Sequence, residues 1–227
     1  KDYIINRYLI REDKVTVIPT CVDHKVFYEE ETDRNHVNKI GFLGTLVSGW
    51  FNLKLMHKFI NVISKELPSY KFEIISSDTQ DQIYSAFDKE SLNIRDFNID
   101  ISYVDRSELR EKINSLSFLA MFYNANNVCE IARSPTKIGE ALACGLPIMI
   151  NSGIGDVDQL VSKFNIGVVL ESNSSDEIAL KTQKLLDMIS EDNNTKKRCV
   201  ETSQEIYSLN KGSQKYLRIY DGLCGPK

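Results

Sequence analysis

Two segments of this 227-residue chain combine residue types that could bind an anion. The first is the loop Gly44–Gly49, which has a glycine at each end and the hydroxyl groups of Thr45 and Ser48 between them. It joins an apolar run that ends at Leu43 to a helical pattern that starts at about Trp50. Backbone N–H groups at such a strand-to-helix turn can approach a phosphate closely. The alternative is a tight turn in which glycine serves only the backbone, and this loop alone does not decide between the two.

The second segment opens a predicted helix with a capping residue, a proline and a cation. Ser134 is a good N-cap, and Pro135 suits the first helical position. The backbone amides of Thr136 and Lys137 would then point outward beside an ammonium group, which suits a phosphate or pyrophosphate. Glu140 lies one turn further on and could accept hydrogen bonds from sugar hydroxyls. The alternative is a capped surface helix on which Lys137 and Glu140 are merely solvated.

Hydrophobic patterning predicts the elements that position these two segments. Short apolar runs rich in β-branched and aromatic residues are the expected strands: Val15–Ile18, Ile40–Leu43, Phe72–Ile75, Ile99–Tyr103, Phe118–Phe122, Ile148–Ile150 and Val168–Leu170. Amphipathic segments with helical spacing lie between these runs. Two of them start with a capping pattern, at Asp105–Glu108 and at Ser174–Glu177.

Strands that alternate with helices predict an α/β fold. We expect one Rossmann-like domain with a mostly parallel sheet over residues 1–190, followed by C-terminal helices that pack on it over residues 191–227. In such a sheet, ligands bind outside the carboxyl ends of the strands. Both candidate anion-binding segments follow a predicted strand in the chain, so they are expected at this edge.

Composition narrows the classes of function. The chain has 28 Lys and Arg against 32 Asp and Glu, a net charge of −4, and 42% hydrophobic residues. This is ordinary globular composition, and the acidic balance argues against nucleic acid as a partner. Five widely spaced cysteines without a C-x-x-C pattern, and three histidines that do not cluster with them, predict neither a disulfide framework nor a metal site. A reducing compartment, the cytoplasm, is the expected location.

Several motifs together resemble the C-terminal nucleotide-sugar-binding domain of the retaining group 1 family of GT-B fold glycosyltransferases. The similarity is greatest for E-A-L-A-C-G-L-P-I-M-I at residues 140–150, preceded by S-P-T-K at residues 134–137. Weaker similarities occur in family order at residues 17–23, 41–52, 155–160 and 167–170. The resemblance runs from about residue 15 to residue 190, which is most of the chain.

The resemblance implies a role for each candidate residue. Glu140 would bind the ribose hydroxyls of the donor, while the Gly44–Gly49 loop and the helix start at Ser134–Lys137 would hold the pyrophosphate. Tyr103–Val104 would contact the base, and Ser76–Ser77 would line the same cleft.

Two departures from the family pattern concern the donor sugar and the diphosphate. The family pairs two glutamates with seven residues between them, but Ala132 stands where the first would be. Glu130, with nine intervening residues, is left open as a catalytic substitute. The Arg and Lys that follow the family's glycine loop are also missing, so neutralisation of the pyrophosphate would depend on Lys137 together with Arg133.

The function that the resemblance implies is transfer of a hexosyl group from a nucleotide diphosphate sugar to a saccharide or lipid-linked acceptor. It further implies synthesis of cell-surface polysaccharide or lipopolysaccharide, no metal cofactor, and peripheral contact of the full enzyme with the inner face of a membrane. The acceptor would be bound by an N-terminal domain that we expect to be absent from this chain, so the chain alone is expected to be inactive. Two alternatives remain: a GT-B-type nucleotide-sugar epimerase, and a non-catalytic α/β binding module.

Overall fold

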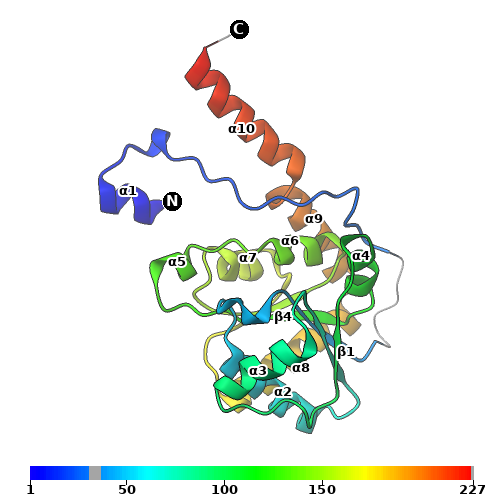
Figure 1. The fold of residues 1–227 in the computed structure, drawn as a ribbon. Coiled ribbons are helices and arrows are strands. Elements are labelled where there is room, and N and C mark those ends of the chain that lie inside the picture. The colour runs from blue at the N-terminus through cyan, green and yellow to red at the C-terminus, as the bar shows by residue number, and fades with distance from the viewer. Residues whose placement is uncertain (31–36, 226–227) are drawn as a thin grey trace.

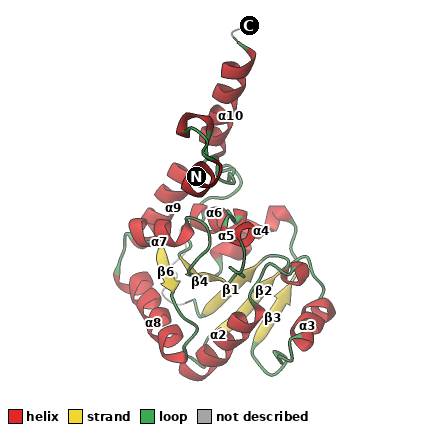
Figure 2. Ribbon diagram, turned by 90° about the vertical axis from the view of Figure 1, so that its left-hand side faces the viewer, coloured by secondary structure: helices red, strands yellow, loops and turns green. Residues whose placement is uncertain are grey.

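The computed structural model describes residues 1–30 and 37–225, except for the side chains of residues 130 and 131. Within them a six-stranded sheet has the order β3-β2-β1-β4-β5-β6, and all its neighbouring strands pair in parallel (Figure 2). The strands are β1 (Lys39–Leu43), β2 (Lys71–Ile75), β3 (Ile99–Ser102), β4 (Phe118–Met121), β5 (Ile148–Asn151) and β6 (Gly167–Leu170). The predicted α/β, Rossmann-like fold with a parallel sheet is therefore confirmed.

Helices cover both faces of the sheet (Figure 1). One face carries α2 (Leu53–Glu66), α3 (Gln80–Lys89) and α8 (Ser175–Glu191). The other carries α4 (Arg106–Asn114), α6 (Thr136–Ala143), α7 (Val157–Phe164) and α9 (Thr195–Ile206). Short helices α5 (Val128–Ile131), η1 (Glu12–Lys14) and η2 (Leu46–Ser48) lie in the connections, and the terminal helices are α1 (Asp2–Tyr8) and α10 (Leu209–Cys224).

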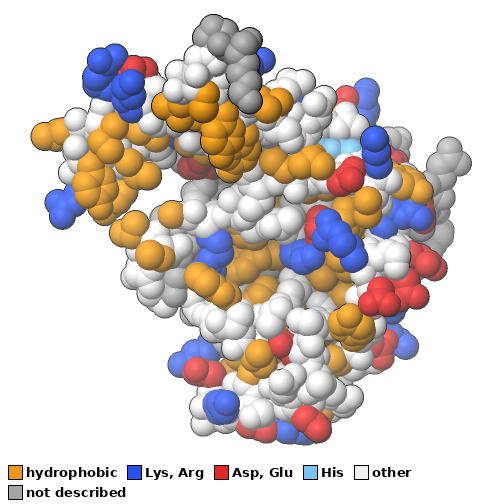
Figure 3. Space-filling view, turned by 45° about the horizontal axis from the view of Figure 1, so that its top comes forward, with side chains coloured by type: hydrophobic (Ala, Val, Ile, Leu, Met, Phe, Trp, Pro, Cys, Tyr) orange, Lys and Arg blue, Asp and Glu red, His pale blue; other side chains and the backbone are white. Residues whose placement is uncertain are grey.

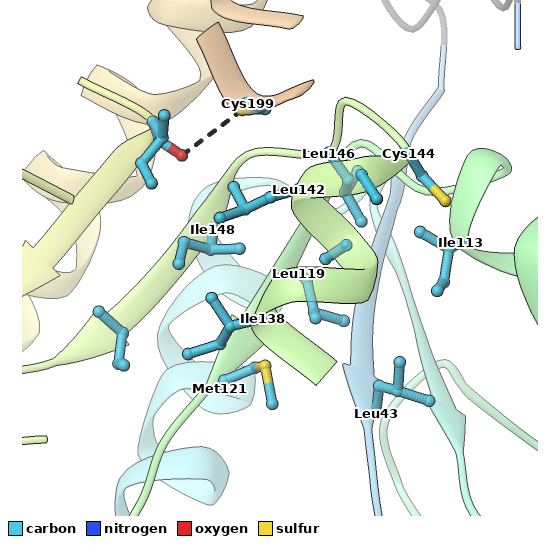
Figure 4. Close-up of a cluster of buried hydrophobic side chains, with 14 of the residues drawn as sticks. Leu43, Ile113, Leu119, Met121, Ile138, Leu142, Cys144, Leu146, Ile148 and Cys199 are labelled. Atoms are coloured by element: carbon cyan, nitrogen blue, oxygen red, sulfur yellow. Dashed lines mark hydrogen bonds between the residues drawn. The ribbon is translucent and has the colours of Figure 1, made fainter. Parts of the chain in front are cut away.

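The strand sequences are almost continuously apolar because each face of the sheet packs against helices. In β4 and the residues that follow it, Phe118 and Phe122 belong to the cluster under α2 and α8, while Leu119 and Met121 belong to the cluster under α6. Figure 4 shows this second cluster, where side chains of β4 and β5 meet those of α6. There the Cys199 thiol of α9 lies 3.8 Å from the carbonyl oxygen of Ile166, which directly precedes β6.

The strand predicted at Val15–Ile18 is wrong. No strand forms there within the described residues, and Val17 is 47% exposed. The segment instead leads to an isolated bridge between Val22 and Ser208, in the turn between α9 and α10. The apolar pattern is strand-like, but the six-stranded sheet does not extend to this segment.

Two predicted helix starts differ in detail from the structure. Helix α6 begins at Thr136, so Pro135 precedes the first helical residue, and Ser134 bonds to Thr20 instead of capping the helix. Helix α4 begins after Asp105, whose side chain makes no cap hydrogen bond within the described part of the chain.

The capping pattern at Ser174 is confirmed, because its hydroxyl accepts a hydrogen bond from the Glu177 amide at 3.2 Å.

The terminal helices are the least buried elements. Helix α9 packs against α6, whereas α10 projects from the body and has Gly212 as its buried residue (Figure 1). Exposed apolar side chains gather on α1 and α10, including Tyr8 and Tyr220 (Figure 3). In the described ranges no helix is both long and apolar enough to cross a membrane.

Candidate functional site

The strand order places a crevice between β1 and β4. The chain moves outward from β1 through β2 to β3 and then returns to β4 on the other side, so neighbouring loops leave β1 and β4 in opposite directions. Ligands of open α/β sheets bind at such a switch point. A cavity of about 550 Å³ lies here. Its lining residues are Leu43, Gly44, Thr45, Ser48, Trp50, Phe51, Tyr123, Cys129, Arg133, Pro135, Thr136 and Lys137.

The predicted glycine loop forms one wall of this cavity. Gly44 has φ +141°, and a Cβ there would lie 2.7 Å from the Phe51 ring, so this position requires glycine. The Thr45 hydroxyl lies 3.1 Å from the Ser77 hydroxyl. The Ser48 hydroxyl donates a hydrogen bond to the Thr45 carbonyl oxygen at 2.6 Å. Gly49, the other predicted glycine, lines a separate cavity of about 670 Å³ between η2, α2 and α3.

Asp78, which the sequence reasoning did not single out, fixes the position of this loop. One of its carboxylate oxygens accepts hydrogen bonds from the Val47 amide at 3.1 Å and from the Ser76 hydroxyl at 3.0 Å. Both Ser76 and Asp78 are buried. Ser76 therefore contacts the loop indirectly, through Asp78. Ser77 forms a hydrogen bond with Thr45, which lines the cavity.

The start of α6 forms the opposite wall and carries the two residues predicted to bind the donor. Lys137 Nζ lies 2.9 Å from Glu140 Oε2, and the Glu140 side chain is 1% exposed. Glu140 is thus a buried, ion-paired carboxylate, so the alternative in which it is merely solvated is wrong. Because α6 starts at Thr136, the amides of Thr136 and Lys137 are among those without a partner in the helix.

Arg106 is a further member of the site that sequence reasoning missed. Its Nη1 donates to Glu140 Oε1 at 3.2 Å, while its guanidinium carbon lies 5.1 Å from the centre of the Phe27 ring. Arg106 is the first residue of α4 and follows the loop at Tyr103–Val104, so it connects the predicted base-binding loop to the predicted ribose-binding residue. Tyr103 itself is 68% exposed.

Arg133 lines the cavity and lies close to two aromatic rings. Its guanidinium carbon is 4.2 Å from the centre of the Trp50 ring and 5.4 Å from that of Tyr123. Its Nη1 donates to the Trp50 carbonyl oxygen at 3.2 Å, but Nε and Nη2 are buried without a hydrogen-bond partner among the described residues. Burial raises the pKa of the Tyr123 hydroxyl far above its usual range, and the nearby Arg133 charge opposes this only in part. The phenol therefore stays neutral.

Comparison with known proteins rests on structure, because no family model and no curated protein sequence matches the chain. A structure of S. aureus TarM that contains UDP matches with a TM-score of 0.70 at 14% identity, over 96% of this chain and 41% of that one. The C-terminal domain of the group 1 glycosyltransferase LpcC from Francisella tularensis matches with a TM-score of 0.61 at 17% identity, over 83% of this chain and 99% of that domain. The fold is that of a GT-B C-terminal domain.

A third structure supports the same fold. Anabaena HepE in complex with UDP-glucose matches with a TM-score of 0.64 at 15% identity, over 93% of this chain and 58% of that one. The chain therefore spans about 40 to 60% of the length of TarM and HepE, whereas it matches almost all of the isolated LpcC domain.

The groups that line this cavity suit a polyanion. Lys137, Arg133 and the start of α6 supply positive charge and N–H donors, and Thr45 adds a hydroxyl. Among the described residues, no group of three His, Cys, Asp or Glu side chains is placed to hold a metal ion. Glu130 belongs to α5, but its side chain lies outside those that the structure describes, so its candidate catalytic role stays a prediction.

Proposed function

We propose that this chain is the donor-binding domain of a glycosyltransferase that takes a sugar from a nucleoside diphosphate. The observation that carries the proposal is the convergence of the Gly44 loop, the α6 start with Lys137, and Glu140 at the switch point. The fold is shared with structures that contain UDP and UDP-glucose. A diphosphate requires cations and N–H donors, and the attached ribose requires a hydrogen-bond acceptor nearby.

In the proposed complex, the diphosphate lies between the Gly44 loop and the α6 start. Lys137 turns from Glu140 toward the phosphates, and a Glu140 oxygen accepts a ribose hydroxyl in its place. Arg106 must move to admit the ribose, and it can do so because its side chain is 64% exposed and holds Glu140 through its Nη1. The base then lies over Tyr103–Val104.

The chemical contribution of this domain is to stabilise the leaving group. Breaking the bond between sugar and diphosphate leaves additional negative charge on the diphosphate, and the fixed dipole of α6 together with Lys137 opposes that charge. The donor sugar, a hexose in this proposal, moves to a saccharide or lipid-linked acceptor held by a separate domain. We place the full enzyme in cytoplasmic assembly of surface polysaccharide or lipopolysaccharide, in peripheral contact with the membrane.

Titration with UDP, GDP and ADP tests the proposal. We expect one of them to bind and, at 100 times its Kd, to add about 2.7 kcal/mol to the free energy of unfolding. Binding in EDTA should equal binding in Mg²⁺, because the diphosphate is neutralised by side chains. If no nucleoside diphosphate bound, the non-catalytic alternative would replace this proposal. Conversion of a free nucleotide sugar without any acceptor would favour the epimerase.

A further inference from the structure

Trp50, the single tryptophan of the chain, lines the cavity with an exposed indole ring on a fixed backbone. Its carbonyl oxygen accepts hydrogen bonds from the Asn124 amide at 3.0 Å and from Arg133 Nη1 at 3.2 Å. The Arg133 guanidinium also lies over the indole, at 4.2 Å from Cζ to the ring centre. Trp50 is nonetheless 48% exposed, so the ring offers apolar surface to the cavity while Arg133 supports one of its faces.

The other aromatic side chains of the cavity lie beside Trp50. The Tyr123 ring centre is 5.4 Å from the same guanidinium carbon of Arg133, and it is 4.9 Å from the ring centre of Phe51. An isolated antiparallel bridge joins the backbones of Phe51 and Tyr123. Trp50, Phe51 and Tyr123 therefore form an aromatic wall that is held in place before any ligand binds.

The proposed positions of the ribose and the diphosphate leave this aromatic wall for the donor sugar. Lys137 is the lining residue that contacts Glu140, the proposed ribose ligand, at 2.9 Å. In a nucleotide sugar, the ribose and the sugar are attached to opposite ends of the diphosphate. With the ribose at Glu140 and the diphosphate at Lys137, the sugar extends into the part of the cavity that the aromatic wall lines.

A half-exposed indole is chemically suited to a sugar ring. A pyranose has hydroxyl groups along its edge and C–H groups on its faces, so one face can leave water without losing a hydrogen bond. The face of an aromatic ring carries partial negative charge and attracts such C–H groups, in addition to the gain from burying apolar surface.

We propose that Trp50 is the stacking surface for the sugar of the donor, a nucleoside diphosphate hexose. This inference rests on the proposed function, since it assigns the sugar end of the same site. It separates the contribution of the sugar from that of the nucleotide: Trp50 contacts the hexose, whereas the diphosphate and the ribose bind elsewhere in the site.

Calorimetric titration of Trp50→Ala tests the assignment with two ligands that differ only in the sugar. These are the nucleoside diphosphate that binds the wild type and its hexose derivative: UDP and UDP-glucose, GDP and GDP-mannose, or ADP and ADP-glucose. Loss of stacking on one apolar ring face predicts a Kd about 3- to 30-fold higher for the hexose derivative. The Kd of the bare nucleotide should change by less than about 2-fold, as for a surface substitution without a role.

Two further variants show whether the ring itself is responsible. Trp50→Phe keeps an aromatic face, so its Kd for the hexose derivative should lie between those of wild type and Trp50→Ala. Tyr28→Ala is the matched control, because Tyr28 is 46% exposed and has the Arg110 guanidinium 4.0 Å from its ring centre, but it is outside the cavity lining. Its Kd values for both ligands should equal those of wild type, and thermal unfolding shows that each variant is folded.

Trp50 emission gives an independent readout, since no other tryptophan contributes. Excitation at the long-wavelength edge of indole absorption avoids absorption by the base. Saturating hexose derivative should change the emission more than saturating bare nucleotide does. Equal emission with the two ligands, or a Trp50→Ala Kd that changes for both ligands alike or for neither, would overturn the assignment.

Failure of the sugar contact and failure of the donor site give different results. If the wild type binds both ligands and Trp50→Ala binds them with unchanged Kd values, Trp50 does not contact the sugar and the donor-binding proposal stands. If the wild type binds none of UDP, GDP, ADP and their hexose derivatives, both proposals fail.

Discussion

Lys137 and Glu140 are adjacent in the structure but have different proposed partners in the complex. Lys137→Ala should raise the Kd for both nucleoside diphosphate and pyrophosphate by about 10- to 150-fold, because a charge-assisted hydrogen bond to phosphate is lost. Glu140→Gln should weaken the nucleotide but not pyrophosphate, because its partner is the ribose. Calorimetric titration gives all four values.

Lys197→Ala is the control for these variants. Lys197 also pairs with a glutamate on its own helix, Glu201, at 3.8 Å, but the pair is exposed on α9. It should leave both affinities unchanged. Equal binding by wild type, Lys137→Ala and Glu140→Gln would show that the site is elsewhere.

A second buried carboxylate, that of Glu73, contributes to the stability of the fold. It is 2% exposed and lies 2.6 Å from Lys112 Nζ and 3.1 Å from Lys39 Nζ. Burial alone would raise the pKa of the Glu73 carboxyl, but the hydrogen bond from Lys112 and the positive charges of Lys112 and Lys39 outweigh burial, so the pKa lies below its ordinary value. Because the folded-state pKa is the lower one, Glu73 stabilises the fold above its unfolded pKa and loses this contribution as the pH falls through the folded one.

Glu73→Gln should therefore lower the free energy of unfolding by about 1.5–3 kcal/mol at neutral pH, where charged hydrogen bonds are lost. The difference from wild type should shrink as the pH falls below the unfolded pKa of about 4.5. Urea unfolding of both proteins across this range measures it. Glu90→Gln, which removes an exposed pair with Lys54, should change stability by less than about 1 kcal/mol. A difference that grew toward acid pH would contradict this account of Glu73.

Sequence patterns identified site residues that are close together in the chain, but not the contacts between residues of different elements. Lys137 and Glu140 could be predicted because they share one helix start with Pro135. Arg106 could not, since 34 positions separate it from Glu140 and only the packing of α4 beside α6 joins them. Asp78 was missed for the same reason, because its partner Val47 lies in another connection.

At the scale of elements, the loop after β1 depends on glycine at its first position. Gly44→Ala would place a methyl group 2.7 Å from the Phe51 ring at φ +141°. We expect a loss of about 1–3 kcal/mol in the free energy of unfolding, since both strain and overpacking are introduced. Gly222→Ala in α10, where a Cβ meets none of the described atoms within 4 Å, should instead be neutral or stabilising by up to about 1 kcal/mol. Chemical denaturation compares the two, and equal effects would rule out a special role for Gly44.

The packing of the elements explains where strand prediction succeeded and where it failed. The runs that became β1 and β4 are apolar because helices cover both faces, and sequence alone carries that signal. Val15–Ile18 has a similar pattern, yet a strand also needs a neighbouring backbone, which the pattern does not encode. Likewise, Ser134 has the chemistry of an N-cap, but Thr20, from the other end of the chain, takes its hydroxyl instead.

At the scale of the whole molecule, alternation of strands and helices was enough to predict a parallel sheet, but not the strand order. The order β3-β2-β1-β4-β5-β6 determines that the loops after β1 and β4 face a common crevice. That order depends on which strands pair with one another, and the pattern of any one segment does not encode this pairing. The predicted division at residue 190 stays a prediction.

Donor binding and sugar transfer should separate in this chain. The cavity between the Gly44 loop and α6 is the proposed donor site, and the chain spans 41% and 58% of the lengths of TarM and HepE. Transfer also requires an acceptor hydroxyl held against the sugar, and well-oriented positioning can lower a reaction barrier by as much as about 7–11 kcal/mol. The chain alone should therefore bind its nucleotide sugar without transferring the sugar to added saccharide or lipid-linked acceptors. Mass spectrometry of the acceptors after prolonged incubation, with binding followed in parallel, checks this. Robust transfer by the chain alone would mean that it also binds the acceptor productively, and would refute the assignment of a donor-binding role alone.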